Sequence, residues 1–346
     1  MRKTLILLGF MLVLAVPVQA IDLAAPPAPD PAMEWMPAEP QNLQEGIRDV
    51  LVKIIRGVRP DLKEASEVCV KITVVLMVVS VLRTIPGSTE KTADLAGTVA
   101  AAGLLLSSTG SLINLGAETV NEVSDYGKLL LPVLAAALGA QGGITTASAL
   151  YAGTAFFDAV LSQIISKFLL PFIYVFLLLA IANSAIGEES LKKLKDMVRS
   201  VMTWLLKTLL YVFTGYIGIT GVVSGPTDAM ALKAAKLTIS GFVPVVGGIL
   251  SDASEAVLVS AGSVKNAVGL YGLFAVLAIW IGPFLKIGSH YLLLRFTGGI
   301  CSIFGSKNAT ELISDFATAM GYLLGMTGAV CLMLLISTVC FMRGVS

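Results

Sequence analysis

The sequence has little charge and few of the side chains that most enzymes use for chemistry. Charged residues make up 14% of the 346 residues, against about 25% in an ordinary soluble domain. The single histidine, His290, leaves no histidine cluster for a metal and no H-E-x-x-H site, and we expect it at a membrane interface beside Tyr291. The chain also lacks the G-x-x-x-x-G-K-[ST] loop that cradles ATP phosphates and the G-x-G-x-x-G dinucleotide motif. We therefore expect a protein that is not an enzyme and that has no cofactor and no metal.

Cysteine is scarce and scattered. The four cysteines lie in or beside apolar runs and form no C-x-x-C pair: Cys69, Cys301, Cys331 and Cys340. This pattern favours buried thiols over a disulfide framework or a metal site. The net charge of +1 gives no bulk attraction to nucleic acid, so we expect no nucleic-acid partner.

Long apolar runs are what the sequence has in abundance. Hydrophobic residues make up 56% of the chain, and the mean hydropathy is +0.86. Several runs reach the length of about 20 apolar residues that a helix needs to cross a bilayer, and they are continuous rather than alternating, unlike the strands of an outer-membrane barrel. The sequence predicts an all-α, polytopic helical bundle in the cytoplasmic membrane.

The N-terminal part of the chain contains three predicted segments before the transmembrane domain at 65–346. Residues 1–20 have Arg2 and Lys3, an apolar core and a small-residue cleavage site, which is typical of a signal peptide; an uncleaved anchor is the alternative. Residues 21–40 are rich in proline and alanine, and we expect an extended, solvated linker outside the cytoplasm. Residues 41–64 have the pattern of an amphipathic helix that lies on the membrane surface or caps the bundle.

Charge predicts which segments face the cytoplasm. Predicted spans at 68–85 and 93–115 enclose a turn with Arg83 and Lys91, and an acidic segment follows at 118–128. The positive-inside rule places the basic turn inside the cell and the acidic segment outside. The most basic segment, 187–200, is predicted as a cytoplasmic loop before further spans.

The apolar region at 129–155 is interrupted by Gln141, Gly142 and Gly143. Each arm is about 18 Å long at 1.5 Å per residue, which is too short to cross a membrane alone. We expect a re-entrant hairpin here, and the same question arises at 241–262; a single span weakened by glycine is the alternative.

One long, mostly apolar stretch, 241–272, carries charged and amide side chains. If it is helical, Asp252, Glu255 and Asn266 share one stripe, with Lys265 beside it. Such a stripe must face protein or water, because lipid offers no hydrogen-bond partner. The two interpretations are a lining of a packed bundle or conduit and a surface loop between spans.

A short internal sequence similarity adds residues to this polar set. Asp158-Ala-Val-Leu161, followed by Lys167, resembles Glu255-Ala-Val-Leu258, followed by Lys265. This similarity suggests an internal repeat of 129–223 and 241–342, and duplicated halves are common in transporters. We therefore predict an intramembrane polar lining or packing set: Asp158, Lys167, Asp252, Glu255, Lys265 and Asn266.

Residues 235–269, AKLTISGFVPVVGGILSDASEAVLVSAGSVKNAVG, carry a resemblance to a known family. With the predicted signal peptide, proline-rich lead and several spans, the chain resembles stage III sporulation protein AE of endospore-forming bacteria. The resemblance implies a non-enzymatic, permease-like subunit of a channel complex, similar to a secretion system, that links mother cell and forespore. It also implies a mother-cell membrane location, with a separate ATPase and ring-forming proteins as partners.

The resemblance implies no catalytic residues. The alternative function is a stand-alone secondary transporter of a small solute, with Asp158, Lys167, Glu255 and Lys265 near its site.

Overall fold

The computed structural model describes residues 25–37, 43–83, 90–140, 144–219 and 267–343. Within these ranges the chain is helical and contains no strand, which confirms the predicted all-α class. The elements are α2 (Asp30–Met33), α3 (Leu43–Leu82), α4 (Glu90–Ala140), α5 (Ile144–Ile164), the π-helix η1 (Ile165–Leu169), α6 (Leu170–Ile186), α7 (Glu189–Ile219), α10 (Ala267–Phe304) and α11 (Lys307–Arg343).

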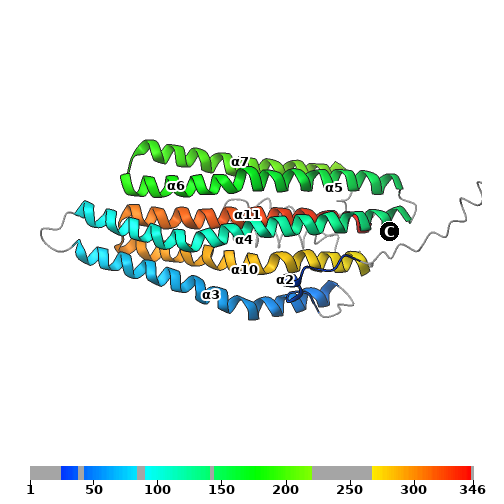
Figure 1. Ribbon diagram of the computed structural model, residues 1–346, viewed down its shortest axis with the longest axis horizontal. Helices are drawn as coiled ribbons and strands as arrows, with labels where there is room; N and C mark the ends of the chain where they lie inside the picture. The colour runs from blue at the N-terminus through cyan, green and yellow to red at the C-terminus, as the bar shows by residue number, and fades with distance from the viewer. Residues whose placement is uncertain (1–24, 38–42, 84–89, 141–143, 220–266, 344–346) are drawn as a thin grey trace, which may run out of the picture.

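The long helices lie side by side along one axis and form an elongated bundle (Figure 1). α4 has 51 residues and α3 has 40, which correspond to about 76 Å and about 60 Å at 1.5 Å per residue. Five helical segments in the described residues are long and apolar enough to cross a membrane: Gln44–Leu82, Thr92–Ala137, Leu150–Ile186, Val268–Ile303 and Lys307–Met342. The chain therefore has the helices of a multi-pass membrane protein.

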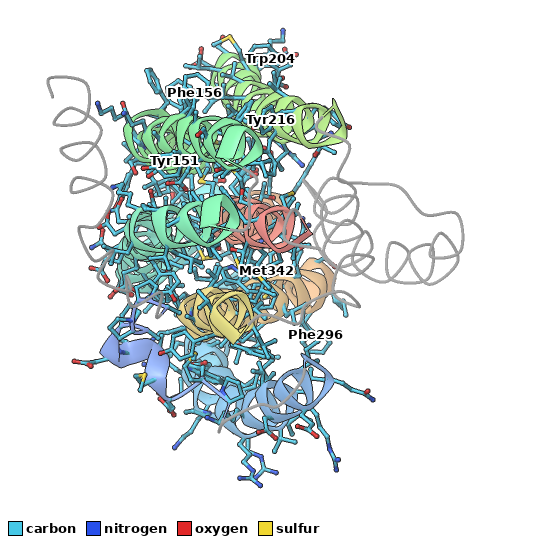
Figure 2. The ribbon with its side chains drawn as sticks, turned by 90° about the vertical axis from the view of Figure 1, so that its right-hand side faces the viewer. Tyr151, Phe156, Trp204, Tyr216, Phe296 and Met342 are labelled. Carbon is cyan, nitrogen blue, oxygen red and sulfur yellow. The ribbon has the colours of Figure 1, made fainter. Side chains whose placement is uncertain are left out.

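α11 is the centre of the bundle. It packs against α4, α5, α6 and α10, and every position from Asp315 to Met342 except Leu332 is buried. Small residues permit this close packing, since Gly116 of α4 faces the Leu323 side chain and a Cβ built there would lie 3.1 Å from Leu323 Cδ2. The end view shows α11 beside α4, with α10 below them and with α3 and α7 at the two outer edges (Figure 2).

The helix ends gather in two groups at opposite ends of the bundle (Figure 1). The C-terminal ends of α3, α6 and α10 lie with the N-terminal ends of α4, α7 and α11. An ion pair of 3.3 Å between Arg83 Nε and Asp94 Oδ1 joins α3 to α4 there, and Gly187, with φ of 74°, ends α6 in the left-handed conformation that glycine favours. The two basic segments that we predict to be cytoplasmic, around Arg83 and 187–200, therefore lie at one end.

α4 corrects the predicted boundaries of the second span. The helix runs without a break through the acidic segment 118–128 and past Pro132 to Ala140. Glu118 and Glu122 are exposed, whereas Val120, Val123 and Tyr126 are buried, so the segment is an amphipathic helix and not a loop. The arms 129–140 and 144–155 are the ends of the long helices α4 and α5 and not two separate short helices. The re-entrant hairpin at 129–155 stays a prediction.

Two further predicted breaks, and one pair of glycines, lie inside helices. The amphipathic segment 41–64 and the span 68–85 share α3, with Pro60 inside it. The predicted basic loop 187–200 belongs to α7 from Glu189 onward. α10 continues past Gly298 and Gly299, a pair of glycines that could have ended it. His290, which we expect at a membrane interface, is only 3% exposed and is therefore buried in the bundle. In each case one face of the segment packs against the bundle. This packing keeps the segment helical although its composition is typical of a helix end.

The proline-rich lead also differs from the prediction. Residues 25–37 pack against the bundle, and Ala28 and Ala32 are 6% and 3% exposed. The Ala28 N–H donates to the Tyr271 hydroxyl at 3.2 Å, and the Tyr126 hydroxyl donates to the Pro26 carbonyl at 3.0 Å. Small alanine side chains permit this close approach, so the predicted solvated linker is wrong for 25–37.

Two predictions lie outside the described residues. These are the signal peptide at 1–20 and the polar stretch 241–266, which includes the second possible re-entrant segment. The internal repeat of 129–223 and 241–342 depends on that stretch and stays a prediction.

Candidate functional site: polar groups buried between helices

The structure separates the predicted polar set. Asp252, Glu255, Lys265 and Asn266 lie outside the described residues. Asp158 of α5 is 4% exposed. Lys167 of η1 is exposed, and its Nζ lies 3.4 Å from Gln163 Oε1 on the same helix. Asp158 and Lys167, although near in sequence, therefore face different surroundings.

Asp158 lies where α5 meets α4 and α11. Ser124 Oγ donates to Asp158 Oδ2 at 2.8 Å. Gly127 of α4 leaves room for the carboxyl group, because a Cβ built at this glycine would lie 3.9 Å from Oδ2 and 3.2 Å from Leu334 Cδ1. Asp158 Oδ1 is buried and has no hydrogen-bond partner among the described residues.

A π-helical turn follows Asp158 at η1 and joins α5 to α6. Pro171 lies just after this turn and has no N–H to donate to the carbonyl four residues earlier, at Lys167. A widened turn is one way in which a helix accommodates that loss without ending. The result is one continuous helical rod from Ile144 to Ile186.

A second buried cluster joins α7 to α11. Lys195 is 3% exposed, and its Nζ donates to Asp315 Oδ2 at 2.6 Å and to Glu311 Oε1 at 2.9 Å. Burial acts to lower the pKa of Lys195, but the hydrogen bonds and charges of Asp315 and Glu311 outweigh burial, so the pKa is raised. The ammonium group is therefore charged and paired with two carboxylates.

A neutral hydrogen-bond pair continues this junction. The Tyr322 hydroxyl donates to the Arg199 carbonyl at 3.0 Å and lies 2.7 Å from Thr203 Oγ1. Together the two sets of contacts fix the register of α7 along α11. The sequence prediction placed Lys195 in a loop and did not include this cluster. The one local sign of the cluster was the four-residue spacing of Glu311 and Asp315, which puts both side chains on one helical face.

A cavity of about 480 Å³ lies between α2, α3, α4 and α10. Its lining includes four carboxylates and one ammonium group, together with apolar and aromatic side chains: Glu34, Asp61, Glu118, Glu122, Lys286, Trp35, Leu115 and Ile279. Lys286 Nζ also pairs with Glu64 Oε2 at 2.9 Å. The surplus of carboxylates favours cations over anions in this cavity.

The described part of the chain offers neither a metal site nor a disulfide. Among those residues no group of three or more His, Cys, Asp or Glu side chains is arranged to hold a metal ion. The four cysteines are buried and form no disulfide, as their apolar surroundings predict.

Comparison with known proteins places the chain in a family. A family model described as stage III sporulation protein AE matches residues 36–344. Stage III sporulation protein AE of Bacillus subtilis (strain 168) is 24% identical over 234 residues, which cover 68% of this chain and 59% of that relative. The chain thus matches about three fifths of the relative's length, and no solved structure matches it. Since the family match extends over nearly all of the helical bundle, the chain belongs to the stage III sporulation protein AE family.

Proposed function

We propose that this chain is a non-enzymatic, permease-like membrane subunit of a sporulation-specific channel complex that links mother cell and forespore. The observation that carries the proposal is the family match over residues 36–344, which coincides with the helical bundle. Its place is the mother-cell membrane, and its partners are other stage III subunits, including a separate ATPase and ring-forming proteins.

Helix length supports a role in an assembly. The hydrocarbon core of a bilayer is about 30 Å thick, so α4, at about 76 Å by its residue count, extends well beyond it. Part of the bundle therefore lies outside the hydrocarbon, where it offers surface to other subunits.

The position of α11 supports a subunit rather than a self-contained carrier. Because α11 fills the centre of the described bundle, we expect any conduit to form between subunits rather than along the axis of one copy. Large apolar side chains on the outer faces, such as Val74 and Val81 of α3 and Trp204 of α7, at 53%, 64% and 65% exposed, are suited to lipid or to neighbouring subunits.

Purification of the tagged chain from sporulating cells tests the proposal. We expect the ATPase and ring-forming subunits to copurify after mild detergent extraction, and we expect loss of the gene to block sporulation after engulfment. A tagged multi-pass membrane protein of unrelated function, expressed at the same stage, is the control for non-specific copurification.

The stand-alone transporter predicts a different outcome. The purified chain alone would then move a solute across vesicles, and sporulation partners would be recovered no more than with the control protein. That result would overturn the proposed subunit role.

A further inference from the structure

Asp158 has an acidic side chain in a place where a negative charge is costly. It is 4% exposed and lies in a helical segment apolar enough to span a membrane. An ionised carboxylate in such surroundings costs several kcal/mol unless a cation or several hydrogen-bond donors compensate it. The charge state of Asp158 therefore depends on which groups surround its carboxyl group.

The donors around Asp158 are too few for a carboxylate. Ser124 Oγ makes the one hydrogen bond to the side chain, and Oδ1 has none among the described residues. Thr154, one turn earlier on α5, donates to the Leu150 carbonyl at 2.6 Å, so its hydroxyl hydrogen is already used. A buried carboxylate usually accepts more bonds than this.

The charged groups that face the site do not neutralise it either. On α4 these are Asp125 and Lys128, which pair with each other at 2.7 Å, with side chains 71% and 64% exposed. α11 presents the apolar Leu334 at this point. Among the described residues the nearest ammonium group, that of Lys128, is therefore solvated and already paired, and Asp125 adds a further negative charge.

A neutral carboxylic acid suits the geometry. A serine hydroxyl accepts as well as donates, so the 2.8 Å contact between Ser124 and Asp158 can be reversed, with the acid donating to Ser124 Oγ. The serine hydrogen is then available to a carbonyl of its own helix, as Thr119 donates to the Leu115 carbonyl one turn earlier on α4 at 2.7 Å.

We propose that Asp158 is a proton-binding site, whose carboxyl group carries a proton at neutral pH and donates it in a hydrogen bond to Ser124. The bound ligand is one proton, which bulk water supplies and takes back. This inference does not depend on the proposed role in sporulation, because it concerns the bundle alone.

Infrared spectroscopy of the purified full-length protein in liposomes tests the proposal directly. At pH 7 the spectrum of the wild type minus that of Asp158→Asn should contain one C=O stretching band of a protonated carboxylic acid. Asparagine keeps the shape and the hydrogen bond to Ser124, so the variant should fold. Asp125→Asn removes an exposed carboxylate one residue from Ser124 and should leave the acid band unchanged.

Two further variants test the hydrogen bond to Ser124 and guard against a variant that does not fold. Ser124→Ala should move the acid band to higher frequency, because the hydrogen bond is lost. If Asp158→Asn fails to accumulate, Asp158→Glu should shift the band rather than remove it.

Two results would overturn the proposal. The difference spectrum could contain only carboxylate bands, which would mean that a cation from outside the described residues pairs with Asp158. The acid band could instead disappear when sodium replaces choline at constant pH, which would make the site one for a metal cation.

Discussion

Two ionisable side chains inside the bundle have opposite surroundings. Lys195 has two carboxylate partners within 2.9 Å, whereas Asp158 has one hydroxyl. A paired charge fixes helices together, and its loss leaves a buried partner without compensation. The unpaired acid is best accommodated without charge. Substitutions at the two residues should therefore differ in their effects.

Substitution of Lys195 should be strongly destabilising. Lys195→Met removes the ammonium group and leaves Asp315, 9% exposed, without its partner; the expected loss is about 3–5 kcal/mol of unfolding free energy. Thermal unfolding of the detergent-solubilised protein measures it. Lys193→Met is the matched control, because its pair with Glu189 is 75% and 81% exposed and should change stability by less than about 1 kcal/mol. Equal effects of both variants would contradict the buried pairing.

The contribution of Lys195 should persist into alkaline solution. A raised pKa in the folded state means that the stabilisation is complete below the unfolded pKa, near 10.5, and is lost as pH rises through the higher folded pKa. The stability difference between wild type and Lys195→Met should therefore be constant from pH 7 to about pH 10 and shrink above that. Unfolding curves across this range check it, and a difference that vanishes by pH 8 would refute the pairing.

Sequence could predict Asp158 but not its partner, and it predicted no member of the Lys195 cluster. Asp158 was singled out because its segment resembles the one around Glu255, yet Ser124 lies 34 positions away on another helix. Lys195 was read as solvated because its neighbours are charged, and its partners lie 116 and 120 positions away. Long-range packing, which no local pattern encodes, decides both environments.

At the scale of elements, the main differences from the sequence prediction concern where helices end. Pro60, Pro132 and the Gly298-Gly299 pair all lie inside helices, although proline and glycine have low helix propensity. Burial of one helical face outweighs these local costs, and an exposed face of charged residues then resembles a loop in composition. The existence of the helices was predictable, but their continuity was not.

The N-terminal segment offers a test of packing at this scale. A side chain added at Gly57 would overlap the Trp35 ring, which also lies against Gly282. Trp35→Ala should therefore loosen residues 25–37, and Gly57→Val should do the same by occupying the place of the ring. The readout is the reaction rate of Ala28→Cys, at a position 6% exposed, with a water-soluble thiol reagent.

The matched control is Trp204→Ala, which removes an exposed tryptophan of α7. It should leave the reaction rate at position 28 unchanged. If Trp35→Ala also leaves the rate unchanged, the ring does not hold the segment in place.

At the scale of the whole molecule, the grouping of helix ends predicts sidedness. The connection between α6 and α7, with Glu188, and the start of α11, with Lys307, belong to one group of helix ends. The C-terminal end of α4, which follows Lys128, belongs to the other (Figure 1). Glu188→Cys and Lys307→Cys should react with an impermeant thiol reagent from the cytoplasmic side, and Lys128→Cys from outside. The native cysteines are buried, so the background should be low. Reaction of Glu188→Cys and Lys307→Cys from opposite faces would contradict the bundle.

The fold class and the family could be predicted from the sequence because both depend on composition and on local motifs. Long apolar runs established a helical membrane protein, and the segment 235–269 indicated the family that the comparisons confirm. The arrangement of the helices across the bundle could not be predicted. It depends on contacts such as those of α11 with α4 and α10, which join parts of the chain that are far apart in sequence.

The central place of α11 has a consequence for biogenesis. Within the described chain it is the last helix to leave the ribosome, yet the earlier helices close around it. They must wait in the membrane with their inner faces incomplete, shielded by lipid or by the insertion machinery, until the final segment arrives. Assembly of this bundle is therefore completed only after translation has reached its last helix.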